Sequence, residues 1–506
     1  MTPLKYFRHR YHILLYASIL FIYGSALFAA SDLPIWSQIT AFESQALHQI
    51  HAAKRGSPEA LLKLFLLASG DVRTNNQYLK IKSRLNQFFL NLPADTFNGK
   101  SEWEKGYILN KKMHQILFRE NELDKSSHYH ADQSQLSKIF STTQYNCISS
   151  SLLYLYLAKK INLDVDAVLL PTHSFVQLNL SNGKNIEIET TSSNGFDWIH
   201  DRKFYHNLSK NWFSKRGLQP STYEDYLRRT IIKPSRLAAV NMMTQHTFPE
   251  RMKFYDRLRL LEFSILIAPE ETDNLLSLLY AYNNLYIQLH ENKDTFELKN
   301  LYDQSYDHIK SLITKYRYNS KISKASQGYL TQAAYSYLKV GELEKSRSIF
   351  LFGLNSAREK IKNDEKLNQN YLAIFSGLLK GYLRNGQTNI GNRVINSVNQ
   401  KINLATGWEK VILWYFSKRM EAYWNKEEWQ KITKLYDSFK RFNINLSNAE
   451  QFKLNVQSAY LNYALKYERV GNWRKATKII LTCRHKIKNA QKCSQRLTKL
   501  QQQHQG

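Results

Sequence analysis

The sequence contains, in this order, three residues of the types that cooperate in nucleophilic catalysis: Cys147, His173 and Glu189. A cysteine reacts as its thiolate, and a neighbouring imidazole can accept the thiol proton and later return it as an acid. A carboxylate can accept a hydrogen bond from the second ring nitrogen and so orient the imidazole. These residue types therefore indicate a cysteine nucleophile, provided that folding brings the three together.

A helix is predicted from Cys147 to Lys160, because apolar residues fill this stretch and Asn146 is a good N-cap residue. Cys147 would then lie in the first helical turn. The unpaired backbone N–H groups and the dipole of that turn stabilise a thiolate. The predicted helix therefore also favours Cys147 as a nucleophile, in agreement with the order of Cys147, His173 and Glu189 in the sequence.

Three short strands are predicted after this helix, at residues 165–170, 173–180 and 184–189, and the last two form a hairpin. His173 would begin the second strand, and Glu189 would end the third. This segment is the only convincing β region that the sequence contains.

The length of the hairpin loop decides where His173 and Glu189 point. A two-residue loop, Asn182-Gly183, would place apolar and acidic side chains on the same face. A three-residue loop, 181–183, with Gly183 in a left-handed conformation, shifts the register by one. One face then holds Val176, Leu178, Leu180, Ile186 and Ile188, and the other holds His173, Phe175, Glu187 and Glu189. We predict the three-residue loop, because it allows one apolar face to be buried. Independently, the same register brings Glu189 diagonal to His173.

At these positions the sequence resembles the transglutaminase-like branch of the papain-fold enzymes, and most closely its bacterial members. The resemblance covers roughly residues 100–215 and implies that Cys147 is the nucleophile, His173 the general base and acid, and Glu189 the orienting carboxylate. Much of the superfamily has Asp where this chain has Glu189, which is longer by one methylene. The motifs that carry the resemblance are Tyr145-Asn146-Cys147-Ile148-Ser149, Pro171-Thr172-His173, and Glu189-Thr190-Thr191-Ser192 with Gly195-Phe196.

The donors for an oxyanion are less legible in the sequence. The candidates are the Cys147 backbone N–H and a side chain from Gln144 or Tyr145. No cofactor is implied by the resemblance. His128 and His130 lie near Asp132, but this spacing is a weak metal signal, so we predict a solvated loop there and no metal site.

The rest of the chain is predicted to be mostly helical. Only 18 Gly and 9 Pro occur among 506 residues, which favours long helices with few tight turns. The fold class is therefore mostly α with a small α+β domain. We predict a helical lead-in at 31–99, a transglutaminase-like domain at 100–215 and helical repeats from 216 to 506.

A pattern of small, Tyr, Gly, small and apolar residues recurs in the last part of the chain. Its copies are 41–45 residues apart. The pattern resembles tetratricopeptide repeats, which implies an α-solenoid of paired antiparallel helices with a concave surface for a protein partner. The alternative is an irregular helical bundle. The two clear copies are Ala334, Tyr337, Gly341, Ser346, Phe350 and Ala464, Tyr467, Gly471, Ala476, Ile480, and weaker copies surround Gly386 and Trp429.

The N-terminus has the layout of a secretory signal. Lys5, Arg8 and Arg10 precede an uncharged apolar run at 13–30, which ends in small residues. We predict a signal peptide at 1–30 and export, with the periplasm as the expected compartment. The alternative is an uncleaved membrane anchor, since the run is at the short edge of a membrane span.

The three cysteines bear on the question of export. Cys483 and Cys493 could form a local disulfide in an oxidising compartment, which would leave Cys147 as the odd thiol. The alternative is three buried, inert thiols.

The formal net charge is +29, and the stretch from Arg469 to the end holds ten Lys or Arg and no acid. Such a surface attracts lipid head groups, acidic cell-wall polymers or nucleic acid, of which nucleic acid is the least expected for an exported chain. The alternative is a solvated basic face without a partner.

Together these features predict an exported cysteine hydrolase, a transglutaminase-like peptidase or amidase, that acts on a protein or peptide. The repeats would recruit a protein partner, and the basic tail would favour an anionic envelope surface. One alternative is a non-catalytic envelope scaffold, in which the repeats bind the partner and the transglutaminase-like core is structural. A second is a cell-wall-associated factor whose main property is its charge.

Overall fold

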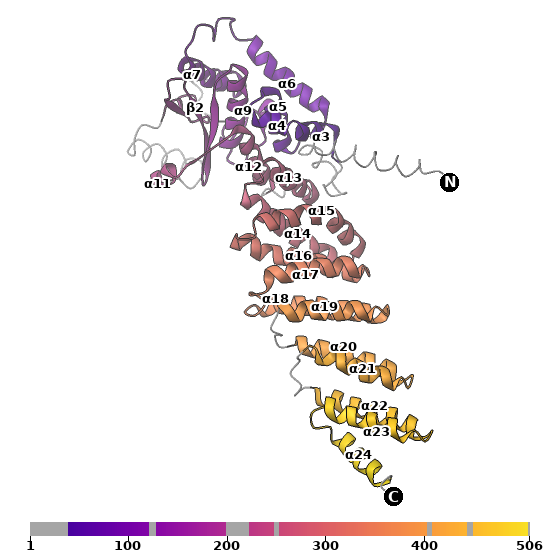
Figure 1. Cartoon of the computed structure of the whole chain (residues 1–506). Coiled ribbons are helices and arrows are strands. Elements are labelled where there is room, and N and C mark those ends of the chain that lie inside the picture. The colour runs from indigo at the N-terminus through magenta and orange to yellow at the C-terminus, as the bar shows by residue number, and fades with distance from the viewer. Residues whose placement is uncertain are drawn as a thin grey trace, which may run out of the picture. The chain divides into compact units, whose positions relative to one another are not determined.

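The computed structural model describes residues 39–120, 128–198, 222–246, 252–401, 407–442 and 449–503 (Figure 1). These residues form two compact units, one of residues up to 285 together with 300–322, the other of residues 286–299 and from 323 onward. Most of them are helical, as predicted. The signal segment predicted at 1–30 lies outside the described residues. Within the ranges given, no helix is both long and apolar enough to cross a membrane.

Helix α5 (Pro58–Ser69) lies in the middle of the core of the first unit. It begins at Pro58, whose fixed φ suits the first helical turn, and it ends at Gly70, which has a left-handed φ of 76°. Nearly all of its side chains are buried. The helices that surround it in the chain are α3 (Ala41–His48), α4 (Ile50–Lys54), α6 (Asn75–Leu90), α7 (Glu102–Lys112) with the π-helical turn η1 (Met113–Leu117), and α8 (Leu136–Thr142).

Helix α9 (Cys147–Lys160) is the second buried helix of this unit. Its residues from Ser149 to Ala158 are all buried, because it packs against two strands on one side and against α5, α7, α8 and α12 (Pro234–His246) elsewhere. A helix enclosed on all sides is expected to be apolar all round rather than amphipathic. The bounds predicted for this helix, Cys147 to Lys160, are confirmed. Two further helices complete the described part of this region, α11 (Tyr223–Leu227) and α13 (Phe254–Ile267).

The sheet has four antiparallel strands in the order β3-β2-β1-β4. The three predicted strands are present as β1 (Val165–Leu170), β2 (His173–Asn179) and β3 (Asn185–Ile188). The prediction that no strand follows them was wrong, since β4 (Thr230–Ile232) pairs with β1. This strand has three residues and only Ile232 is buried, so it carries no alternation that a sequence pattern could detect. The sheet thus includes residues beyond 215.

The hairpin has the predicted register. Val176 pairs with Ile188, and Leu178 pairs with Ile186. The loop is Ser181–Gly183, and Gly183 has a left-handed φ of 83°. The apolar face of the hairpin belongs to the large core that contains α9, whereas Phe175 on the other face joins a small cluster with Val168, Leu170 and Tyr226. The prediction of a three-residue loop is therefore confirmed.

From Thr272 onward the described chain contains only helices. Most are long and are joined in pairs by short turns (Figure 1). They are α14 (Thr272–Glu291), α15 (Thr295–Lys315), α16 (Ser320–Lys339), α17 (Leu343–Ala357), α18 (Glu365–Arg384), α19 (Thr388–Lys401), α20 (Trp408–Trp424), α21 (Trp429–Lys440), α22 (Glu450–Glu468), α23 (Trp473–Lys486) and α24 (Gln491–Gln503).

The same turn joins the two helices of each pair. In each, a residue with left-handed φ follows the first helix, and the next backbone N–H donates to a carbonyl five residues earlier, which is a helix C-cap of the Schellman type. The left-handed residues are Gly341, Gly386, Glu427 and Gly471, and the bonds are Glu342 to Tyr337, Gln387 to Tyr382, Glu428 to Tyr423 and Asn472 to Tyr467, at 2.8–2.9 Å. The recurring Tyr and Gly of the sequence pattern are thus the two ends of one turn.

A fifth copy of this turn was missed in the sequence. Between α14 and α15, Lys293 takes the left-handed conformation and the Asp294 N–H donates to the Leu289 carbonyl at 3.0 Å. Here Lys replaces Gly and Leu replaces Tyr, so the pattern is not visible although the backbone is the same.

Hydrogen bonds tie the helix pairs between α16 and α21 to one another. The Tyr371 hydroxyl of α18 donates to Gln327 of α16 at 2.7 Å, and the Tyr415 hydroxyl of α20 donates to the Thr388 carbonyl of α19 at 3.0 Å. The Trp408 indole of α20 donates to Asn368 of α18 at 2.8 Å. Buried tyrosine and tryptophan need such partners, so the large aromatic side chains fix the packing of neighbouring pairs as well as filling space.

A disulfide joins Cys483 of α23 to Cys493 of α24, with the Cα atoms 6.2 Å apart. Cys147 is the remaining free cysteine.

Replacing Cys483 and Cys493 by Ser should loosen the last two helices. Removing a cross-link between residues 10 apart should cost about 2–3 kcal/mol, since the unfolded chain regains freedom. Amide hydrogen exchange in α23 and α24 of the full chain should become faster. Cys147→Ser is the matched control and should leave these amides unchanged. Equal protection in the double variant and the wild type would show that the disulfide is not stabilising.

Candidate active site

The N-terminus of α9 is built by Asn146, as predicted. The Asn146 side-chain oxygen accepts from the backbone N–H groups of Ile148 and Ser149, both at 3.0 Å, and the Ser149 hydroxyl accepts from the Asn146 N–H at 2.9 Å. The Asn146 amide also donates to the Ala131 carbonyl at 3.0 Å. This reciprocal cap holds Cys147 as the first residue of the helix.

His173 and Glu189 are brought together by the hairpin. His173 begins β2, Glu189 follows β3 directly, and the His173 Nε2 lies 2.5 Å from the Glu189 Oε2. The other carboxylate oxygen accepts from the backbone N–H of Thr191 at 3.1 Å and from its hydroxyl at 2.5 Å. Burial raises the pKa of Glu189, but the charge of His173 and these hydrogen bonds hold that pKa below its ordinary value. Glu189 is therefore a buried carboxylate that stays ionised.

Cys147 forms the third member of the group. The His173 side chain and the Ser174 backbone both lie close enough to its thiol to lower the pKa of that thiol. The structure thus brings together the three residues named first from the sequence.

The electrostatics of the group favour an ion pair. Burial raises the pKa of the Cys147 thiol, but the hydrogen bond and charge of His173 and the backbone of Ser174 lower that pKa below its ordinary value. Burial lowers the pKa of His173, whereas the charge of Glu189 and the contact with Cys147 hold that pKa well above its ordinary value. Thiolate and imidazolium are therefore the favoured forms near neutral pH.

Little of this group reaches the surface. Cys147 is 8% exposed, His173 5% and Glu189 4%. All three side chains are therefore buried.

The two candidate oxyanion donors are in different states. The Tyr145 hydroxyl donates to Glu120 at 2.6 Å, so its proton is already engaged, and its ring stacks on Phe118. Gln144 is half-buried, and its side-chain amide makes no hydrogen bond within the described parts of the chain. The oxyanion role of both residues stays a prediction.

A second buried histidine lies beside the group and was missed in the sequence. His114, on the π-helical turn η1, contacts Glu120 through Nδ1 at 2.7 Å and the Thr190 carbonyl through Nε2 at 3.1 Å. Glu120 in turn accepts from the Tyr145 hydroxyl, two residues before Cys147. Its sequence signal is one histidine among apolar helical residues, which is more often a core position than a functional one.

Thr190 links the two segments of the group directly. Its hydroxyl bonds to those of Ser150 at 2.8 Å and Ser151 at 3.0 Å, both on α9. The helix that carries Cys147 and the strand end that carries Glu189 are therefore fixed to each other by buried hydroxyl groups. Of these residues, Thr190 belongs to a motif that carried the family resemblance.

The loop with His128 and His130 is less solvated than predicted. Tyr129 forms a bridge with Tyr145, and His128 is half-buried with Nδ1 2.6 Å from the Thr143 hydroxyl. His130 and Asp132 are exposed. Among the residues that the structure describes, no group of three or more His, Cys, Asp or Glu is placed to hold a metal ion.

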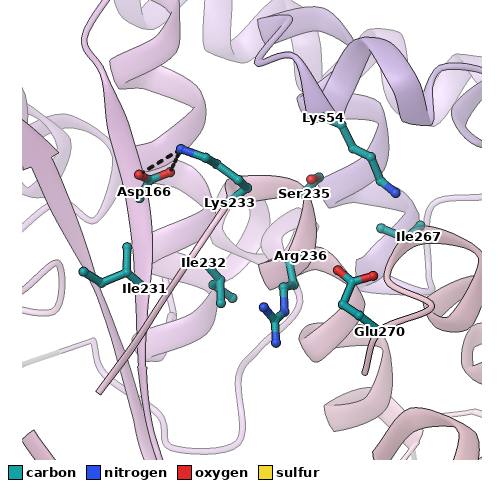
Figure 2. Close-up of a pocket in the computed structure, with 9 residues that line it drawn as sticks. All are labelled: Lys54, Asp166, Ile231, Ile232, Lys233, Ser235, Arg236, Ile267 and Glu270. Atoms are coloured by element: carbon teal, nitrogen blue, oxygen red, sulfur yellow. Dashed lines mark hydrogen bonds and ion pairs between the residues drawn. The ribbon is translucent and has the colours of Figure 1, made fainter. Parts of the chain in front are cut away.

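A cavity of about 420 Å³ lies apart from this group, between β1, β4, α4, α12 and α13 (Figure 2). Its charges are mixed, and Lys233 is paired with Asp166 at 2.9 Å. Neither Cys147, His173 nor Glu189 lines it, so it is not part of the candidate active site. The lining residues are Lys54, Asp166, Ile231, Ile232, Lys233, Ser235, Arg236, Ile267 and Glu270.

The fold and the site together define a class of protein. It is mostly helical, with a four-stranded antiparallel sheet and a buried group of Cys, His and Glu. Residues 80–232 match the transglutaminase-like superfamily, a range that includes the three residues and all four strands. The chain therefore contains a transglutaminase-like domain. The domain limits of 100 and 215 stay a prediction.

The other comparisons are weak. No curated protein matches the sequence. Among solved structures, the chain is similar to a crystal structure of menin that reveals the binding site for Mixed Lineage Leukemia (MLL) protein. The identity is 12%, the match covers 75% of this chain and 88% of that chain, and the TM-score is 0.30. We draw no argument from a likeness at this level.

Gly195→Ala should displace Glu189. A Cβ at Gly195 would collide with the Glu189 backbone carbonyl. The Glu189 N–H also donates to the Gly195 carbonyl at 2.8 Å, so the two backbones are held close together. Crowding of this kind typically costs about 1–3 kcal/mol. Urea unfolding should show lower stability, and Cys147 should react more slowly with iodoacetamide. Ser193→Ala, in the same turn, is the control without a clash, and an equal effect of both would contradict this assignment.

Glu189→Gln should shift the reactivity of Cys147 to higher pH. Losing the carboxylate charge lowers the pKa of His173, the thiolate loses its imidazolium partner, and the pKa of Cys147 rises. Direct repulsion between Glu189 and the thiolate acts in the opposite sense but is the smaller effect. The alkylation rate, measured against pH by mass spectrometry, should move up by about one to three pH units.

Glu187→Gln is the matched control for this measurement. Glu187 lies on the same strand but pairs with Tyr226 at 2.7 Å and Arg229 at 3.0 Å. Its removal should leave the pH profile in place. A shift as large as that of Glu189→Gln, or none with either variant, would refute the role given to Glu189.

Proposed function

We propose that this protein is an exported cysteine hydrolase of the peptidase or amidase type. The observation that carries the proposal is the buried group in which His173 bonds to Glu189 at 2.5 Å and lowers the pKa of the neighbouring Cys147 thiol. The transglutaminase-like match over 80–232 supports the same chemical class.

The reaction would proceed in two steps. The Cys147 thiolate attacks the carbonyl carbon of an amide, a C–S bond forms, and the C–N bond breaks as the His173 imidazolium gives its proton to the leaving amine. Water then attacks the thioester carbon while His173 takes a proton from the water. A C–O bond forms and the C–S bond breaks, which releases a carboxylic acid and restores the thiolate and the imidazolium. We favour water over an amine as the second reactant because water is abundant and no acceptor site is visible among the described residues.

The remaining residues would position and stabilise this reaction. Glu189 keeps the imidazole oriented, and Thr191 keeps Glu189 in place through two hydrogen bonds. The oxyanion would lie near the Cys147 backbone N–H, one of the unpaired amides of the first turn of α9, and near the Gln144 side chain.

Export rests on two features. The basic and apolar leader at 1–30 has the layout of a secretory signal. The disulfide between Cys483 and Cys493 is typical of oxidising compartments such as the periplasm. If the leader is retained, the protein would be anchored to the membrane.

The helical pairs would form a tetratricopeptide-like solenoid that recruits a protein substrate or partner. The recurrence of one Tyr–Gly turn and the hydrogen bonds between successive pairs support this proposal. Repeats of this kind bury their apolar faces only against their neighbours, which leaves an extended surface for binding.

The low exposure of Cys147 favours one rival, a non-catalytic scaffold in which the core is structural. The labelling rate of Cys147 separates the two functions. A hydrolase should react with iodoacetamide at neutral pH faster in the native than in the denatured protein, because only folding provides the imidazolium. No labelling of the reduced native protein would favour the scaffold.

His173→Ala and Cys147→Ser test the chemistry itself. Loss of a general acid and base should reduce the rate of amide hydrolysis by about 10²-fold or more, and loss of the thiol should abolish it. Release of free amines from protein substrates is the readout. His130→Ala, an exposed histidine of a neighbouring loop, is the control and should retain activity. Hydrolysis that persists in Cys147→Ser would refute the proposal.

A further inference from the structure

The turn between α22 and α23 exposes large apolar side chains. Val470 is 72% exposed, Trp473 38% and Leu465 37%. Single apolar residues on a surface are ordinary, but here three of them lie within nine positions around one turn. Exposed apolar side chains gathered in this way are one property that contact surfaces share.

The same turn is strongly basic. Between 465 and 478 the exposed ionisable side chains are all cations, namely Lys466, Arg469, Arg474, Lys475 and Lys478. The one acid of this segment, Glu468, is buried and ion-paired with Arg496. A partner for this surface must therefore be anionic.

The turn geometry brings the two kinds of side chain to one end of the helix pair. Helix α22 ends at Glu468 and α23 begins at Trp473, and the Asn472 N–H donates to the Tyr467 carbonyl at 2.9 Å. Figure 1 shows the two helices running side by side. The last turn of α22 and the first turn of α23 thus present one tip, with Val470 within its four-residue connection.

An equivalent turn elsewhere in the array lacks this combination. The connection between α20 and α21 has the same C-cap bond and carries Trp424 and Trp429, but both are half-buried. It also contains Glu427 and Glu428 beside Lys426. The basic apolar tip therefore distinguishes the α22–α23 turn from the α20–α21 turn.

We propose that this tip docks on an anionic lipid surface. Val470 and Trp473 would enter the headgroup region, where aliphatic and indole side chains are both favourable, and the surrounding Lys and Arg would pair with lipid phosphates. The charge of the chain led us to expect affinity for an anionic envelope surface, and this proposal names the residues that would provide it. It does not depend on the chemistry proposed for Cys147.

Lipid fits the tip better than nucleic acid. Proteins that bind single-stranded nucleic acid pair cations with aromatic side chains that stack on bases. The most exposed apolar residue here is Val470, an aliphatic side chain that cannot stack. An aliphatic residue at the centre of a basic tip is useful where hydrocarbon lies behind a charged surface.

Vesicle sedimentation with the full chain tests the proposal. The measured quantity is the extra binding that phosphatidylglycerol adds to phosphatidylcholine vesicles, because the apolar leader at 13–30 would bind both alike. Arg474→Gln with Lys475→Gln should weaken this binding about fivefold for each charge. Val470→Asp should reduce it to a similar extent, because it removes the aliphatic contact and adds a negative charge beside the lipid phosphates.

Matched variants on the α20–α21 turn are the controls. Trp429→Ala and Lys426→Gln should leave the phosphatidylglycerol-dependent binding unchanged. Since the substituted residues of the α22–α23 tip are mostly exposed, circular dichroism and the melting temperature should match those of the wild type.

Three results would overturn the proposal. The first is no added binding from phosphatidylglycerol, which would point to an acidic protein partner. The second is undiminished binding in Val470→Asp and in the charge variants. The third is tighter binding to a short DNA strand than to the anionic vesicles, with the same variants reducing it.

Discussion

The bond between His173 and Glu189 is the interaction on which the candidate site depends. It joins residues on neighbouring strands, and it forms only if those strands pair with one particular offset. A slip of one residue would turn Glu189 into the apolar core and remove the partner of the imidazole. The left-handed Gly183 and burial of Ile186 and Ile188 select the offset, so hydrophobic packing sets the electrostatics of the site.

Charge at the site is stabilised by position rather than by solvent. Cys147, His173 and Glu189 are all buried, where isolated charges are costly, and each is held in its charged form by the next. Thr190 joins the segment of Glu189 to α9 through its hydroxyl, and Thr191 donates a hydrogen bond to the Glu189 carboxylate. Burial here therefore raises the strength of the pairing instead of neutralising the groups.

The helical part of the chain follows a different rule. Its order comes from one backbone turn used again and again, and three of the five described copies have tyrosine at one end and glycine at the other. Between the turns the surface side chains vary, which is how the α22–α23 tip differs from the α20–α21 tip while their backbones agree. Repetition fixes the architecture and leaves the surface free to acquire separate binding properties.

The sequence by itself determined the elements that are encoded locally. The Asn146 cap, the start of α9, the hairpin register and the repeating turn each leave a pattern within a few residues, because capping and alternation are short-range. The tertiary structure alone decided the contact of His114 with Thr190, which are 76 residues apart, the pairing of the three-residue β4, and the burial of Cys147. Such contacts arise when distant segments fill the same core, and no period or local motif records them.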